Sequence, residues 1–187
     1  KPRKGEYAAN LARLGGVFAQ LATLSPRPAI LHLPETALTG YFLEGGVRDH
    51  AIMAFDSTAT PGEVRRVSTD DWQIAACPHH GPSLSISAAG TYHVTWFTNG
   101  KARKGLFYAR SQDEGRTFSE PLPIGRADRN PTRPYVLAGP RGTTMVWKEF
   151  DGERTTVHLM TSVDDGASWS RPRVVAATAD SSDHPLL

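Results

Sequence analysis

The sequence predicts a mainly β protein in which four-stranded units repeat behind a short α/β segment. The first observation is a motif of the form S-x-D-x-G-x-[ST]-aromatic, which begins at Ser111 and again 51 residues later at Ser162. The second is a series of short apolar segments and glycine- or asparagine-containing turns around both copies, a pattern typical of β-hairpins. The third is a Ser-Thr-Pro-Gly stretch at 56–62, which separates residues 1–55 from the repeats.

The repeated motif has a mechanical interpretation as a tight turn. An aspartate in such a turn can accept hydrogen bonds from backbone amides just ahead of it. The glycine can take a positive φ at little cost, and the aromatic residue anchors the turn against the sheet. We therefore interpret both motifs as structural and not as catalytic carboxylates. The matched residues are Ser111, Asp113, Gly115, Thr117 and Phe118 in the first copy and Ser162, Asp164, Gly166, Ser168 and Trp169 in the second.

The repeat extends beyond the motif. Trp96 and Trp147 are also 51 residues apart, and each lies in a strand-like apolar segment. Their equivalent positions favour packing between stacked units over a sugar-binding platform. Three similar segments, at 81–84, 133–136 and 184–187, mark the starts of successive units. A period near 50 residues is typical of blade-like repeats, so we expect about two whole units and the beginning of a third.

Each unit is predicted to contain four short antiparallel strands. They cover about 83–88, 92–98, 105–110 and 118–124 in the first unit and about 136–138, 143–148, 156–161 and 173–177 in the second. Short strands with a glycine and an aromatic residue repeated once per unit are typical of a propeller blade. The fold class that we expect is therefore mainly β, an incomplete β-propeller of about two four-stranded blades preceded by a short α/β fragment.

The two motifs resemble the Asp boxes, or BNR repeats, of sialidase-like β-propellers, and the resemblance covers residues 63–187. In that family the boxes lie on hairpins away from the active site. A sialidase also needs an arginine cluster for the substrate carboxylate, an acidic residue and a Tyr–Glu nucleophile pair. No such cluster motif or pair can be assigned in this sequence. The resemblance therefore implies a propeller module that binds a glycan or another small-molecule ligand and lacks a complete catalytic set.

The first 55 residues have a different pattern. Apolar residues at helical spacing predict a helix over 6–25, which Pro26 and Pro28 end. A short apolar run at 29–33 predicts a buried strand, and residues 44–55 predict the beginning of a second helix. A helix followed by a buried strand is an α/β signature.

This segment resembles the start of the carbon–nitrogen hydrolase, or nitrilase, family. The resemblance rests on the K-G-E tripeptide at 4–6, on Asn10 and on the P-E-x-x-L-T-G-Y stretch that begins at Pro34. It implies that Glu35 corresponds to the catalytic glutamate of the family, the general base toward a cysteine nucleophile. No lysine or cysteine of this chain matches the rest of that machinery. The alternative function that the resemblance implies is a relative of these hydrolases without its Cys and Lys.

A ligand site in the repeated part is expected where the innermost strands begin, at the mouth of a propeller channel. The candidate ligand-binding residues there are His79, His80, Arg133, Asp183 and His184. Cys77, the only cysteine of the chain, shares a face with His79 if this segment is extended. A Cys-x-His pair is a weak zinc signal, so a polar channel lining is the favoured interpretation, and no metal or cofactor is predicted.

The composition excludes some partners and leaves others open. The net charge is +2, and the sequence contains no stripe of basic residues of the kind that binds nucleic acid, so no such partner is predicted. No apolar run reaches the length of about 18 residues that would predict a membrane span. Two blades alone would leave open sheet edges, so self-association through these edges is expected. Because both parts look incomplete, we expect a fused or truncated chain, and a non-enzymatic interaction module is the third functional possibility.

Overall fold

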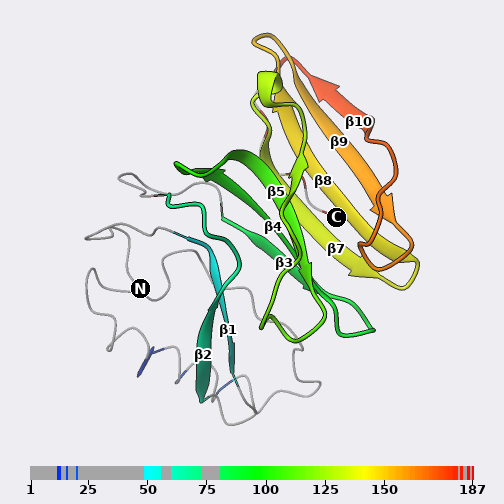
Figure 1. Ribbon diagram of the computed structural model, residues 1–187. Coiled ribbons are helices and arrows are strands. Elements are labelled where there is room, and N and C mark those ends of the chain that lie inside the picture. The colour runs from blue at the N-terminus through cyan, green and yellow to red at the C-terminus, as the bar shows by residue number, and fades with distance from the viewer. Residues whose placement is uncertain are drawn as a thin grey trace.

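The computed structural model describes residues 49–55, 60–72 and 81–180, together with seven single positions nearer the two ends of the sequence. Within these residues ten strands form three antiparallel sheets (Figure 1). The elements are β1 (Ala51–Phe55), β2 (Pro61–Arg66), β3 (Ser83–Ile86), β4 (Tyr92–Asn99), β5 (Lys104–Ser111), β6 (Leu122–Ile124), the 3-10 helix η1 (Ala127–Arg129), β7 (Thr132–Gly139), β8 (Gly142–Phe150), β9 (Thr155–Ser162) and β10 (Arg173–Thr178).

Two of the sheets have the same four-stranded order. The first blade is the sheet β3-β4-β5-β6, and the second blade is β7-β8-β9-β10, with consecutive strands paired in each. The strands β1 and β2 pair with each other and lie on the opposite side of the first blade from the second blade (Figure 1). The predicted fold class, mainly β with two four-stranded blades of an incomplete propeller, is confirmed.

The N-terminal prediction was wrong in one place that the structure describes. The second half of the helix expected over 44–55 is the strand β1, which pairs with β2 so that Phe55 lies opposite Pro61. A short apolar run is compatible with either element, and here Ile52 packs against the core of the first blade. The paired strands β1 and β2 come from the two sides of the linker expected at 56–62. The division of the chain into separate domains at this linker stays a prediction.

The other N-terminal predictions fall largely on residues outside the described ones. The four described positions between 12 and 20 are helical, in agreement with the helix expected over 6–25. The strand expected over 29–33 and the candidate Glu35 lie outside the described residues.

Apolar side chains form two layers, one on each face of the first blade. The layer between the two blades contains Leu106, Tyr108, Ile124, Met145, Trp147 and Met160. The layer between the first blade and the β1–β2 hairpin contains Val67, Val94, Trp96, Phe107 and Ala109. Trp96 and Trp147 are both 0% exposed, which confirms the prediction that they pack in the core. Since side chains alternate along a strand, both faces of β4 and β5 are buried.

Each motif occupies the turn between the third and fourth strands of its blade, as expected from the 51-residue register. In the first turn, Asp113 Oδ1 accepts the backbone N–H of Thr117 at 2.9 Å, and Asp113 Oδ2 accepts the Thr117 hydroxyl at 2.6 Å. The Gly115 N–H donates to Ser111 Oγ at 2.8 Å. These bonds, first of all the one from the Thr117 side chain, hold the pKa of Asp113 well below its usual range.

The second turn repeats this geometry closely. Asp164 Oδ1 accepts the Ser168 N–H at 2.9 Å, Asp164 Oδ2 accepts the Ser168 hydroxyl at 2.5 Å, and the Gly166 N–H donates to Ser162 Oγ at 2.8 Å. The hydrogen bonds from Ser168 likewise lower the pKa of Asp164. Both aspartates are therefore fixed as hydrogen-bond acceptors for their own turns. The fourth strand of the first blade begins later than expected, at Leu122, because Phe118 and Ser119 belong to the turn, whereas that of the second blade begins at Arg173 as expected.

Candidate functional site

The two blades have a proximal end, where the innermost strands β3 and β7 begin, and a distal end, where β5 and β9 run into the motif turns. Sequence reasoning placed the ligand site at the proximal end. Of the residues predicted there, the structure describes only Arg133. The other candidates lie outside the described residues: Cys77, His79, His80, Asp183 and His184.

Arg133 has an unusual backbone. Its φ is 52°, in the left-handed region, and the pairing of β7 with β8 shifts register between Thr132 and Tyr135. The side chain is half-buried at the beginning of the innermost strand of the second blade. A non-glycine residue in this conformation costs energy, and such residues concentrate at ligand-binding and active sites. Glu114 and Asp165 in the motif turns share the left-handed region, so the conformation alone does not mark a ligand site. At Arg133 it coincides with the strand end where the sequence predicted one.

A second cationic residue lies close to this strand end. Lys148, on β8, pairs with Thr132 across the sheet and is only 7% exposed. Its Nζ donates to the backbone carbonyl of Ser182 at 2.6 Å. Lysine is rarely buried to this degree without a partner. Sequence reasoning missed Lys148, although a lysine inside the apolar strand was the available signal.

Two buried carboxylates also lie toward the proximal end, and each accepts the indole N–H of a repeated tryptophan. Trp96 Nε1 donates to Asp70 Oδ2 at 2.8 Å, and Trp147 Nε1 donates to Glu149 Oε1 at 2.9 Å. Asp70 is 1% exposed and Glu149 is 4% exposed. The Arg126 N–H also donates to Glu149 Oε1, at 3.0 Å. These contacts define the carboxylates as caps for the tryptophans, out of reach of a substrate.

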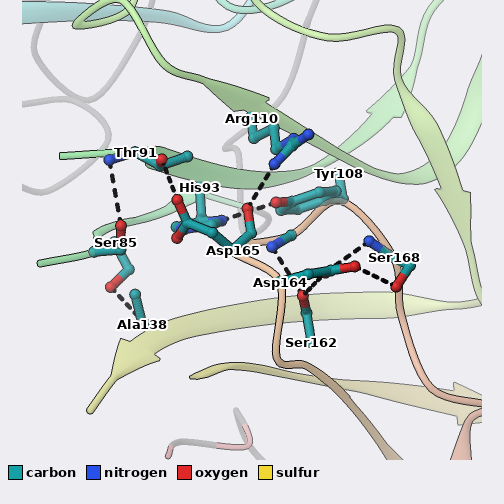
Figure 2. A network of polar contacts seen from close by, with 12 residues as sticks. Ser85, Thr91, His93, Tyr108, Arg110, Ala138, Ser162, Asp164, Asp165 and Ser168 are labelled. Atoms are coloured by element: carbon teal, nitrogen blue, oxygen red, sulfur yellow. Dashed lines mark hydrogen bonds and ion pairs between the residues drawn. The ribbon is translucent and has the colours of Figure 1, made fainter. Parts of the chain in front are cut away.

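The distal end contains a polar network that joins the two blades (Figure 2). His93 on β4 is 0% exposed and lies between two partners, with Nδ1 2.8 Å from Tyr108 Oη and Nε2 3.2 Å from Asp165 Oδ1. Asp165 belongs to the second motif turn, and its other carboxylate oxygen accepts the hydroxyl of Thr91. Arg110 Nη1 donates to the backbone carbonyl of Asp165 at 2.9 Å.

The electrostatics of this network oppose a catalytic role for its tyrosine. Burial raises the pKa of Tyr108 far above its usual value, so the phenol stays protonated at neutral pH. Burial is the largest effect on His93 and sets its pKa below the usual value, although the hydrogen bond to Asp165 acts in the opposite direction. Burial alone would raise the pKa of Asp165, but hydrogen bonds from Thr91, Ser87 and His93 outweigh it and lower that pKa. Because Tyr108 is only 2% exposed and its hydroxyl bonds to the buried His93, we interpret the network as structural.

Sequence reasoning missed this network because Asp165 occupies a variable position of the motif. The available signal was that both copies carry an acidic residue there, Glu114 in the first and Asp165 in the second. Within the described part of the chain, no three His, Cys, Asp or Glu side chains gather closely enough to hold a metal ion. No helix among these residues is long and apolar enough to cross a membrane.

Comparison with known proteins returns solved structures only. No family model matches the chain, and no curated protein does. A Hadza microbial sialidase matches with 15% identity and a TM-score of 0.41, over 62% of this chain and 32% of the sialidase. The α-L-arabinanase of Penicillium chrysogenum, solved with arabinobiose, matches with 15% identity and a TM-score of 0.45, over 72% of this chain and 38% of the arabinanase. The chain thus spans less than half the length of either protein, and its own strand order defines its fold.

The close packing of Gly166 leads to a prediction about the contact between the blades. Gly166 has a φ of 79°, and a Cβ built on it would overlap the Tyr108 hydroxyl and lie 3.0 Å from His93 Nδ1. Gly166→Ala should cost the strain of a left-handed alanine, about 1–2 kcal/mol, and in addition about 1–3 kcal/mol for overpacking. Gly90→Ala is the matched control, because its φ is 85° and nothing lies within 4 Å of the added Cβ. Urea denaturation at pH 7.5 measures both, and equal losses would contradict this view of the interface.

A second prediction concerns the buried carboxylate Glu149. Glu149→Ala removes the acceptor of the Trp147 and Arg126 N–H groups, and each buried donor left unsatisfied costs about 1–3 kcal/mol. Glu149→Gln keeps one acceptor oxygen and should lose less. Glu153→Ala, on the exposed turn after the same strand, should change stability little. Chemical denaturation at neutral pH ranks the three variants, and a Glu149→Ala midpoint equal to that of Glu153→Ala would refute the capping role.

Proposed function

We propose that this chain is a propeller module that binds a carboxylate-bearing glycan at the proximal end of its blades, without a complete set of hydrolytic residues. The observation that carries the proposal is the half-buried arginine at the beginning of the innermost strand β7, Arg133, whose backbone is left-handed where the pairing of β7 with β8 shifts register. Energetically unfavourable backbone conformations persist where the surrounding structure imposes them, and they are concentrated at ligand sites.

The chemistry of the proximal end supports an anionic ligand. A guanidinium presents parallel N–H groups that can hold a carboxylate with two hydrogen bonds, which gives both affinity and direction. Lys148 adds a second positive charge on the neighbouring strand, opposite Thr132. The resemblance of the motif turns to those of sialidase-like propellers makes a sialic acid the first carboxylate-bearing sugar to test.

The described residues also support a binding role over hydrolysis. Sialidase-like chemistry needs a tyrosine that can be deprotonated by a neighbouring carboxylate within reach of the substrate. The Tyr108 hydroxyl does not meet this requirement, because it bonds to the buried His93 at the distal end. Burial also raises the pKa of Tyr108, whose side chain is only 2% exposed.

A protein-interaction module is the second candidate, and one observation favours it. The strand β10 forms the outer edge of the second blade and exposes 56% of Val174 and 47% of Val175. An apolar edge strand can pair with another chain. Concentration-dependent sedimentation of the chain, compared with a Val174→Lys variant, distinguishes this candidate from a monomeric glycan binder.

Binding of a sialylated oligosaccharide tests the proposed function directly. Titration of the wild-type chain with 3′-sialyllactose by NMR should show saturable binding, and Arg133→Ala should weaken it by at least about tenfold because a charge-assisted bond contributes about 1.5–3 kcal/mol. Arg133→Lys should also weaken it, since an ammonium cannot form the planar fork. Arg141→Ala is the matched control, an exposed arginine in the turn at the other end of β7. Equal affinities for wild type and Arg133→Ala, or no binding by wild type, would overturn the proposal.

The second test concerns catalysis. A fluorogenic sialoside should release no fluorophore above the background rate, because the described residues offer no reactive tyrosine–carboxylate pair at the proximal end. A hydrolysis rate above background that disappears in Arg133→Ala would show that the chain is a working sialidase. Retained binding without cleavage is the combination that we expect.

A further inference from the structure

We propose that His93 is an acid-sensitive clamp between the two blades, in which a neutral imidazole connects Tyr108 of the first blade to Asp165 of the second. Protonation of the ring breaks this pattern of hydrogen bonds and loosens the second blade from the first. The inference concerns the contact between the blades and is independent of any ligand at the proximal end.

The geometry fits a neutral ring with its hydrogen on Nε2. In that tautomer Nε2–H donates to Asp165 Oδ1 across 3.2 Å, and Nδ1 accepts the Tyr108 hydroxyl across 2.8 Å. Every polar atom of the ring and of the phenol then has one partner. The side chain of His93 is 0% exposed, so water cannot replace either bond.

Protonation makes both ring nitrogens donors. The Tyr108 oxygen must then accept from Nδ1, and the phenol hydrogen loses the acceptor that it had. Gly166 lies directly against this hydroxyl, so that even a Cβ at that position would overlap it. The Nε2–H bond to Asp165 survives protonation, so the loss is at the Tyr108 hydroxyl. Because this hydroxyl lies against Gly166 of the second blade, the cost of a buried donor without an acceptor falls on the contact between the blades.

The charged groups that face His93 come from two elements. β5 contributes Tyr108 and Arg110, and the loop between β9 and β10 contributes Asp165 and, one residue before it, Asp164. The turn between β3 and β4 contributes hydroxyl groups, and the adjacent part of β7, residues 136–139, carries no titratable side chain.

These groups act in opposite directions on the ring. The Asp165 carboxylate favours a charged imidazole, but it also accepts hydrogen bonds from the hydroxyls of Thr91 and Ser87. Asp164 is held by its own turn. Burial has the largest effect on His93, and together with the nearby Arg110 it outweighs Asp165, so the pKa of His93 is lowered.

The sign of the pH dependence follows from this direction. An unfolded histidine titrates near pH 6.5, whereas the folded ring takes up its proton only at lower pH. Below about pH 6.5 the unfolded chain therefore binds a proton that the folded chain does not, and stability falls as the pH falls. The turn aspartates have lowered pKa values, so their contribution is lost only below their unfolded pKa of about 3.8. Between about pH 4 and 6.5 the histidines dominate.

His50 must be separated from His93 in any test. Its pKa is also lowered by burial, and its Nε2 lies 3.0 Å from the Phe97 carbonyl oxygen. However, it lies between the first blade and the β1–β2 hairpin and does not contact the second blade in any described interaction. A variant of His50 therefore serves as a control for a buried histidine in the other layer.

The first experiment compares unfolding at pH 7.5 and pH 5.0 by urea denaturation. The unfolding equilibrium constant of wild type should rise with acidification, by up to about tenfold for every pH unit between the unfolded and folded pKa values. His93→Gln should reduce this pH dependence, and His50→Gln should reduce a separate share of it. His158→Gln, half-buried on β9, is the control. A pH dependence in His93→Gln equal to that of wild type would overturn the proposal.

The second experiment uses wild type alone, so it does not depend on a variant that folds. The Val136 and Ala138 amides donate across the blade contact to Ser83 Oγ at 3.1 Å and Ser85 Oγ at 2.9 Å. Their hydrogen-exchange protection, corrected for the intrinsic pH effect, should fall at pH 5.0. The fall should be larger than that of the Met160 amide, because Met160 pairs with Met145 inside the second blade. The Hε1 resonance of His93 should titrate below pH 6.5. Titration at or above pH 6.5, or equal protection changes, would refute the clamp.

Discussion

The structure depends on the docking of each motif turn onto the layer that precedes it. The hydrogen bonds inside the turn fix the direction of the backbone carbonyl between Asp and Gly, and an arginine from the preceding layer binds that carbonyl in both copies. Arg65 Nη1 donates to the Glu114 carbonyl at 2.7 Å, and Arg110 Nη1 donates to the Asp165 carbonyl at 2.9 Å. The geometry that the two turns share therefore presents a backbone carbonyl to the arginine of the preceding layer. The glycine that follows allows that layer to approach the turn closely.

Stacking of layers explains why the first blade is buried on both faces. Its inner strand also satisfies the free edge of the next blade, because Ser83 and Ser85 accept the amides of Val136 and Ala138. Backbone amides on the inner edge of a sheet would otherwise need water or another strand. Each blade is thus completed by its neighbour, which is the nearest-neighbour behaviour of repeat proteins. A group such as His93 that lies in this contact affects two blades at once.

The sequence was informative where structure is decided locally. The turns, the strand order of a blade and the burial of the repeated tryptophans follow from residue types at fixed spacing. The strand β1 was mistaken for a helix because Ile52 packs on the first blade, which lies further along the chain and which the local sequence pattern does not reveal. Asp70 and Asp165 were not predicted as partners of Trp96 and His93, since packing brings together residues that lie 26 and 72 positions apart. Glu149 was not predicted as the partner of Trp147, although it lies two residues further along the same strand. Arg133 was predicted by its repeat position, but its left-handed backbone was not.

The two ends of the blades therefore differ in what they can do. At the distal end, Asp164, Asp165, His93 and Tyr108 bond to one another or to the turns around them, so the fold itself uses these groups. At the proximal end, the backbone of Arg133 is held in an unfavourable conformation beside the buried Lys148. Polar groups that are already bonded inside the fold lose those hydrogen bonds when they are redirected toward a ligand. We therefore propose the ligand site at the proximal end and the acid-sensitive contact where the blades meet.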